Sequence, residues 1–196
     1  MNISEKDLEK ELTVGRKKSA KPMLWVSMIS MVMFFAGLTS AYVISMRRDD
    51  WVTFELPDAF YISTVLIILS SITISISQRL IKKDKRELSI AFLLITFVLG
   101  IAFVWQQYAG FEDLRSAGLF FTGPTSTVST SFIIGISLMH AFHVLAVIIV
   151  LLVVIYNHFN HKYTSDDLLG FELGAIFWHF IDVLWIYLFF FFYFIR

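Results

Sequence analysis

Three ionisable side chains, Glu172, His179 and Asp182, interrupt an otherwise apolar stretch near the carboxyl end of the chain. Carboxylates and imidazoles can carry protons, bind metal ions or form buried hydrogen bonds. The stretch is long enough to cross a bilayer as a helix, and ionisable groups at membrane depth are tolerated mainly where they pair inside a bundle or serve a function. The segment therefore predicts either a functional site or a polar contact between helices.

His140 and His143 form a second candidate pair in the preceding apolar stretch, at a spacing that places both on one helix face. At a rise of about 1.5 Å per residue, His143 lies about 21 Å along its span and His179 about 10 Å along the next one. In a hydrocarbon core roughly 30 Å thick these depths coincide. We expect two antiparallel helices to bring His143 and His179 together, with His140 towards one side of the membrane and Glu172 at the other boundary.

These five residues, which we call the intramembrane polar residues, allow three interpretations. They can form a hydrogen-bond network that fixes two helices, because polar groups in hydrocarbon need partners. The same network can also conduct or buffer protons at a subunit boundary. A metal or haem site is the third interpretation, but a carboxylate-bridged di-metal bundle needs Glu-x-x-His motifs on two helices and further glutamates. Only one glutamate lies within a span, so we expect a structural network without catalytic residues or metal ligands.

Three more residues are expected to act in packing and hydrogen bonding. Gln107 lies beside aromatic residues at the end of a span, where amides usually bond between helices or anchor the interface. Trp178 and Trp185 are seven residues apart and share a helix face. Their indole N–H groups need acceptors when they are buried.

The composition indicates which elements position these residues. Hydrophobic residues make up 57% of the 196 residues, 21 of which are phenylalanine, and the mean hydropathy is +0.72. Long apolar runs with few charges are typical of membrane spans. Sixteen basic and sixteen acidic residues cancel, so no nucleic-acid partner is expected. The absence of cysteine excludes disulfides, thiolate metal ligands and thiol nucleophiles.

Five stretches of roughly 20 apolar residues predict an all-α, polytopic membrane protein with a bundle of five transmembrane helices. The predicted spans are about 22–46, 60–80, 88–108, 129–156 and 171–195. The second is diluted by serines, but small hydroxyl residues are common where transmembrane helices approach closely. Residues 1–21 are a charged segment of amphipathic or frayed helix, and residues 22–196 are expected to form one membrane domain.

Lysine and arginine residues are distributed unevenly over the predicted connections. The amino-terminal segment has six, the second connection five and the fourth connection one, whereas the opposite side of the membrane has four. Because basic residues are retained on the cytoplasmic side, this distribution predicts a cytoplasmic N-terminus and an external C-terminus.

Several motifs resemble a known family. They are Met33-Phe34-Phe35-Ala36-Gly37; Leu99, Gly100, Phe103 and Gln107; Ser129-Thr130-Ser131-Phe132; His140-Ala141-Phe142-His143-Val144; Thr164-Ser165; Gly170-Phe171-Glu172; and Trp178-His179-Phe180-Ile181-Asp182-Val183-Leu184-Trp185. Together they resemble subunit III of the haem-copper oxidases of the cytochrome c oxidase type. The resemblance covers nearly all of residues 22–196. It corresponds to the last five helices of the familiar seven-helix form, and Met31 stands where that family commonly has a glutamate.

The resemblance implies a non-catalytic subunit of a bacterial aerobic terminal oxidase in the inner membrane. Such a subunit binds no haem or copper itself, because both belong to the catalytic subunit I. It packs against subunit I and other oxidase subunits, protects subunit I from inactivation during turnover, supports proton uptake and holds phospholipid. The electron donor is cytochrome c or a quinol.

Two other functions remain open. One is a subunit III-like accessory protein of a nitric oxide reductase. The other is an independent membrane redox protein that binds a metal or haem through the intramembrane polar residues.

Overall fold

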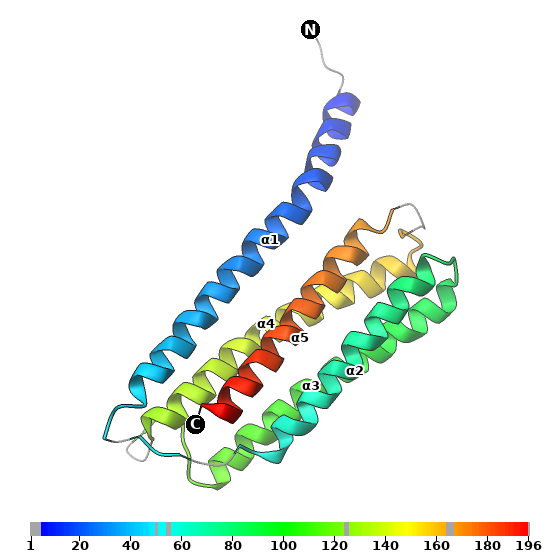
Figure 1. Cartoon of the computed structure of the whole chain (residues 1–196). Coiled ribbons are helices and arrows are strands. Elements are labelled where there is room, and N and C mark those ends of the chain that lie inside the picture. Colours follow the sequence, from blue (N-terminus) through cyan, green and yellow to red (C-terminus); the bar gives the residue numbers. More distant parts are fainter. Residues whose placement is uncertain (1–4, 50, 54–55, 124–125, 164–166, 196) are drawn as a thin grey trace.

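Five long helices account for most of the chain (Figure 1). The computed structural model describes residues 5–49, 51–53, 56–123, 126–163 and 167–195. The helices are α1 (Glu5–Ser45), α2 (Asp58–Ile81), α3 (Arg86–Ser116), α4 (Val128–Phe159) and α5 (Leu169–Phe194). The described residues contain no β-strand, and all five helices are long and apolar enough to cross a membrane. The predicted all-α, five-helix membrane fold is confirmed.

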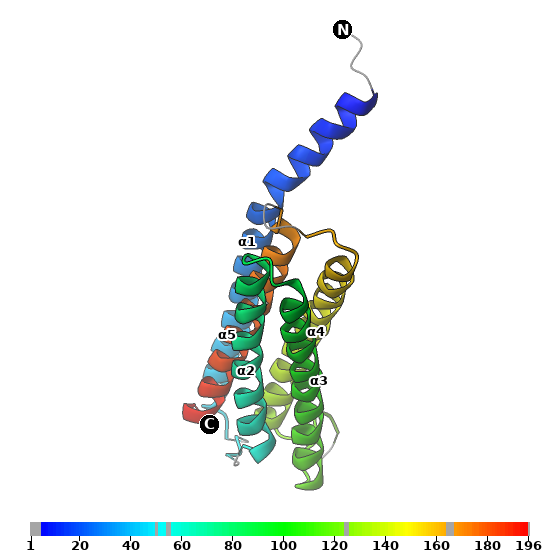
Figure 2. The same ribbon diagram turned by 90° about the vertical axis from the view of Figure 1, so that its right-hand side faces the viewer.

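Helix α1 begins at Glu5, well before the predicted span that starts at Pro22. Proline removes one helical hydrogen bond and its ring crowds the preceding turn, so a proline inside a helix commonly produces a kink. Pro22 lies inside α1, and Figure 2 shows the amino-terminal turns leaning away from the axis of the rest of the helix. The charged segment is therefore a continuation of the first membrane helix.

Helix α3 also extends past its predicted span, from residue 108 to Ser116. A span prediction measures apolar length, whereas a helix continues for as long as its backbone bonds are favourable. The turn between α2 and α3 is tight, and Asp84 adopts a left-handed conformation in it, with a φ of 55°. Short polar residues tolerate that conformation better than most non-glycine residues do.

The helices run alternately up and down. In both views the start of α1, the α2–α3 turn, the end of α4 and the start of α5 lie at one end of the molecule (Figures 1 and 2). Helices α2 and α3 form the most extensive pair, while α5 contacts α1, α2 and α4. In the most apolar stretch of each helix, 56% of the residues of α5 are buried, against 22% of those of α1. Helix α5 is therefore the central helix that positions the candidate residues.

Small residues allow the close packing of α2 on α3. Ser63, Ser70 and Ser77 are fully buried at seven-residue spacing along α2. Ser77 Oγ donates to the carbonyl oxygen of Ser89 on α3 at 2.7 Å, and Thr73 Oγ1 lies 2.8 Å from Thr96 Oγ1. Hydroxyl groups that bond between transmembrane helices satisfy polar atoms that hydrocarbon cannot. The serines that diluted the second span are therefore contact residues.

Candidate functional site

His179 is held by two serines of α2. Its Nδ1 lies 2.6 Å from Ser71 Oγ, and its Nε2 lies 3.2 Å from Ser75 Oγ. The two serines are one helical turn apart, so a single imidazole ring reaches both. In a neutral imidazole one nitrogen donates and the other accepts, and a hydroxyl can take either role. Both ring nitrogens of His179 are therefore satisfied within the membrane-spanning region.

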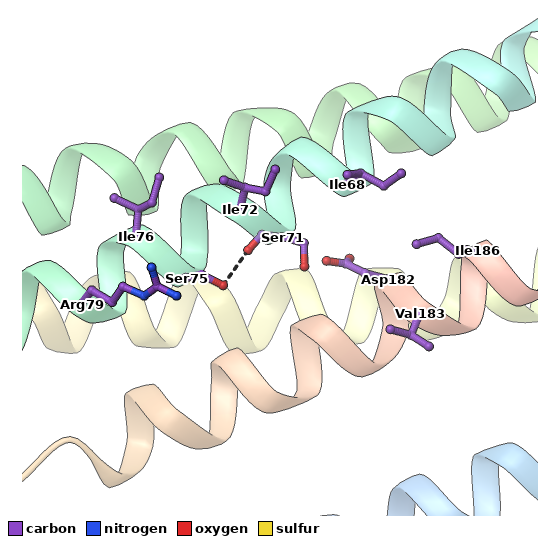
Figure 3. A pocket seen from close by; sticks show the side chains of 9 residues that line it. All are labelled: Ile68, Ser71, Ile72, Ser75, Ile76, Arg79, Asp182, Val183 and Ile186. Atoms are coloured by element: carbon purple, nitrogen blue, oxygen red, sulfur yellow. Dashed lines mark hydrogen bonds between the residues drawn. The ribbon is translucent and has the colours of Figure 1, made fainter.

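Asp182 lies next to His179 on the same face of α5 and also faces α2. Its side chain is buried, with 3% of the residue exposed, and its Oδ2 has no hydrogen-bond partner. Figure 3 shows the carboxyl group and the hydroxyl group of Ser71 directed towards each other across the gap between the two helices. Asp182 is thus the member of the intramembrane polar residues whose hydrogen bonding is incomplete.

Glu172 lies in the first turn of α5 and makes ion pairs with two other segments. Its Oε2 accepts a hydrogen bond from Lys21 Nζ on α1 at 2.9 Å, and its Oε1 is 3.5 Å from Lys82 Nζ at the end of α2. The three side chains are partly exposed, and ion pairs of that kind each contribute about 0–1 kcal/mol. Their main effect is to connect α1, α2 and α5 at one end of the bundle.

His140 is buried between α4 and α5, with 1% of its surface exposed. Its Nε2 lies 3.3 Å from the backbone carbonyl oxygen of Ile181, which can only accept, so Nε2 is the donor. The ring also contacts Trp185 at a centroid distance of 5.2 Å and Phe103 at 6.1 Å. These contacts define His140 as a packing residue with one interhelical hydrogen bond.

His143, in contrast, bonds to its own helix. Its Nδ1 lies 2.7 Å from the carbonyl oxygen of Met139, and its ring meets Phe35 of α1 at a centroid distance of 5.5 Å. The contacts of His143 are thus to α4 and α1, whereas those of His179 are to α2. Among the described residues no hydrogen bond or ion pair joins one of the intramembrane polar residues to another. Matched depth does not determine which way each side chain points around its helix axis.

The three predicted packing residues donate to hydroxyl groups of α2. Trp178 Nε1 donates to Ser70 Oγ at 3.1 Å, and Trp185 Nε1 donates to Thr64 Oγ1 at 3.0 Å. Gln107 Nε2 donates to Ser63 Oγ at 3.0 Å. Sequence reasoning identified these donors but not their acceptors. The signal was present in the serine and threonine residues of the second span, which are Ser63, Thr64, Ser70, Ser71, Thr73, Ser75 and Ser77.

The arrangement of the ionisable side chains bears on the metal or haem interpretation. Within the described ranges, no three histidine, aspartate or glutamate side chains are grouped closely enough to hold a metal ion. His140 is directed to a backbone carbonyl of α5 and His143 to one of α4, so the two imidazoles do not converge. In the described part of the chain, His140 and His179 instead make hydrogen bonds between helices.

The fold and these contacts describe a polytopic helical membrane protein, and sequence comparison gives its family. Residues 3–196 match the family of cytochrome c oxidase subunit III. The chain is 36% identical to a cytochrome c oxidase subunit 3 of Rhipicephalus sanguineus over 141 residues, which cover 69% of this chain and 49% of that protein. It is 26% identical to a cytochrome bo(3) ubiquinol oxidase subunit 3 of Pseudomonas aeruginosa over 167 residues, which cover 83% of this chain and 78% of that protein.

The chain therefore belongs to the cytochrome c oxidase subunit III family, and the resemblance to haem-copper oxidase subunit III is confirmed. A third relative, a cytochrome c oxidase subunit 3 of Aedes aegypti, is 29% identical over 136 residues, which cover 69% of this chain and 48% of that protein. The chain spans about half the length of the Rhipicephalus and Aedes relatives.

Proposed function

We propose that this chain is the non-catalytic subunit III of a bacterial aerobic terminal oxidase of the haem-copper type. The observation that carries the proposal is the family match across residues 3–196. The oxidase complex reduces oxygen to water, and its haem and copper are bound by the catalytic subunit I. This chain carries no redox centre and packs against subunit I and the other oxidase subunits.

The role of the chain in that complex is to stabilise the catalytic subunit, to sustain its proton uptake and to maintain its phospholipid environment. Two features support a structural role. Gln107 of α3 and Trp178 and Trp185 of α5 donate hydrogen bonds to hydroxyl groups of α2, as expected for residues that fix helix positions. Much of α1 is apolar and exposed, including Met23, Val26 and Met33, which fits contact with lipid or with another subunit.

We also propose an orientation and a division of the chain. Residues 1–21 are a cytoplasmic segment and residues 22–196 the membrane domain, in the bacterial inner membrane, with the C-terminus on the external side. The excess of basic residues in the amino-terminal segment and the α2–α3 turn supports this orientation. Lys21 and Lys82, one from each of these regions, meet at Glu172.

Purification of the native complex through an affinity tag on this chain tests the proposal. We expect haem-containing subunits to co-purify and the complex to consume oxygen with reduced cytochrome c or a quinol, which also identifies the donor. Nitric oxide consumption without oxygen consumption would instead support the nitric oxide reductase alternative. Stoichiometric iron or copper in the isolated chain, lost on changing His143 or His179, would support an independent redox protein.

The protective role has a separate test. Oxidase complexes prepared with and without this chain should start at similar rates, and the complex without it should lose activity sooner during continuous turnover. Equal lifetimes of the two complexes would remove the protective role while leaving membership of the complex intact.

A further inference from the structure

A groove with a polar floor opens on the outer face of the bundle between α2 and α5 (Figure 3). Its volume is about 390 Å³. Isoleucine and valine side chains form the two walls, while the polar lining residues are Ser71, Ser75, Arg79 and Asp182. Asp182 lies midway along α5, whereas Arg79 lines the groove in the last turn of α2, so the groove runs from the middle of the span towards one membrane boundary.

The carboxyl group of Asp182 is incompletely bonded in this groove. Its Oδ2 is buried and has no partner, and no ion pair joins it to a described residue. A carboxylate has about four acceptor positions, and even a protonated carboxyl group retains acceptor capacity. A buried polar atom without a partner is destabilising, and more so in hydrocarbon. The group therefore has unused capacity to accept a hydrogen bond.

The residues around Asp182 cannot supply the missing donors. Ser71 has one hydroxyl proton, and its oxygen already bonds His179 Nδ1, so it can give at most one hydrogen bond to the carboxyl group. Ser75 Oγ donates to the backbone carbonyl oxygen of Ser71 and also contacts His179. Arg79 lies two helical turns beyond Ser71 along α2, an axial separation of about 12 Å. Among the described residues that line the groove, none supplies the missing donor.

The walls of the groove have the form that a transmembrane helix fits. Ile68 and Ile72 are four residues apart on α2, and Val183 and Ile186 are three apart on α5. Such spacings form ridges on a helix surface, and the ridges of one helix pack into the grooves of others. Ile72 is 51% exposed and Val183 is 64% exposed, so both ridges are uncovered in the isolated chain.

We infer that this groove receives a transmembrane helix of another subunit, which inserts a hydrogen-bond-donating side chain against Asp182. The inference rests on the proposed function, because the partner is a subunit of the proposed oxidase complex. A lipid acyl chain could cover the isoleucines, but it has no donor for the carboxyl group. A lipid headgroup has donors and can reach Arg79 at the end of the groove, but it does not reach Asp182 in the middle of the span. A partner helix supplies both the apolar surface and the donor.

Photo-crosslinking in the native complex identifies what occupies the groove. A benzophenone amino acid replaces Ile72 in one variant and Val98 in a control variant. Val98 is 64% exposed on α3 and does not line the groove. After irradiation, we expect Ile72 adducts to map by mass spectrometry to a transmembrane peptide of another subunit. Lipid adducts alone at Ile72, in a complex that contains haem subunits, would overturn the inference and leave the proposed function standing. A preparation without haem subunits would overturn both.

Substitution of Asp182 tests the donor. We expect Asp182→Leu to lower the fraction of chain that stays with the complex in a detergent wash by about fivefold, because the donor loses its acceptor. Asp182→Asn retains a side-chain oxygen that accepts, so its retention should be intermediate. The Ile72 crosslink to the partner peptide, measured in the Asp182→Leu background, distinguishes a lost contact from a misfolded chain. Wild-type retention and wild-type crosslinking in Asp182→Leu would show that no donor acts at this position.

Discussion

Each intramembrane polar residue has a different neighbour, and the consequences of substitution differ accordingly. His179 contacts two serines of α2, and His140 bonds to a backbone carbonyl of α5. His143 bonds within α4. A hydrogen bond between helices holds tertiary structure, whereas one within a helix turn adds little to it. The three histidines at similar membrane depths are therefore expected to contribute differently to the stability of the tertiary structure.

His179→Ala should destabilise the chain more than His143→Ala does. Removal of the His179 ring leaves the hydroxyl group of Ser71 without its imidazole partner in a largely apolar region, which typically costs about 1–3 kcal/mol. His143→Ala removes a bond to the same helix and serves as the matched control. The measurement is the midpoint of thermal unfolding of the two variants in the same detergent. Equal midpoints would contradict a structural role for the His179 contacts with α2.

Helix α3 approaches α5 so closely at Gly100 that a larger residue there would displace a neighbouring side chain. A Cβ atom on Gly100 would lie 2.7 Å from Cη2 of Trp178. Trp178 is itself buried and fixed by its hydrogen bond to Ser70, so its ring cannot move away without losing that bond. The close approach therefore couples α3, α5 and α2 at one level of the bundle.

Gly100→Ala should consequently destabilise the protein by about 1–3 kcal/mol, as overpacking of a well-filled core does. Gly37→Ala on α1 is the control, since a Cβ there meets nothing within 4 Å, and it should be neutral or slightly stabilising. Chemical or thermal unfolding of the two variants in detergent measures the difference. A Gly100→Ala chain as stable as the Gly37→Ala chain would show that Trp178 repacks freely.

The elements themselves could be predicted because apolar length alone specifies a membrane span. The five helices followed from that signal, and so did the need of Trp178 and Trp185 for acceptors. The rotation of each helix about its axis did not follow, and therefore neither did the partners Ser70 and Thr64. The amino-terminal part of α1 was not expected to continue the first span, because hydropathy detects only apolar residues and this part is charged. Its backbone nevertheless remains helical through Pro22.

An exposed contact links the amino-terminal turns of α1 to the segment before α5. Lys17 Nζ donates to Asp167 at 2.5 Å, and this hydrogen bond is the largest cause that lowers the pKa of Asp167 below its ordinary value of 3.8. A lowered folded-state pKa means that the contact is complete above the unfolded-state pKa and is lost as pH falls through the folded-state value. Both groups are exposed, so the contact affects the position of α1 more than the stability of the fold.

Electron paramagnetic resonance can measure that position, because the chain has no native cysteine to interfere with labelling. Spin labels on Arg16→Cys and Lys162→Cys should report a fixed separation near neutral pH. The distribution should broaden only in acid below the ordinary aspartate pKa of 3.8. Asp167→Asn should be broad at every pH. A wild-type distribution that matches Asp167→Asn at neutral pH would show that this ion pair does not position α1.

The orientation of the whole molecule is decided by charges at its two ends. Five helices place the α2–α3 turn on the same side as the start of α1, and both regions are rich in lysine and arginine. The end of α3 lies on the opposite side, where Arg115 is one of few basic residues. Since basic connections are retained in the cytoplasm, the α2–α3 turn should be internal and Arg115 external.

Single-cysteine variants can test this orientation directly, since every labelled thiol must be the introduced one. A membrane-impermeant maleimide added to intact spheroplasts should label Arg115→Cys and leave Lys83→Cys unlabelled. After permeabilisation both should react, because both side chains are exposed. The opposite pattern would require the basic turn to have crossed the membrane, and the N-terminus of α1 would then be external. Reaction of both cysteines before permeabilisation would indicate broken spheroplasts, which the accessibility of a cytoplasmic marker protein identifies.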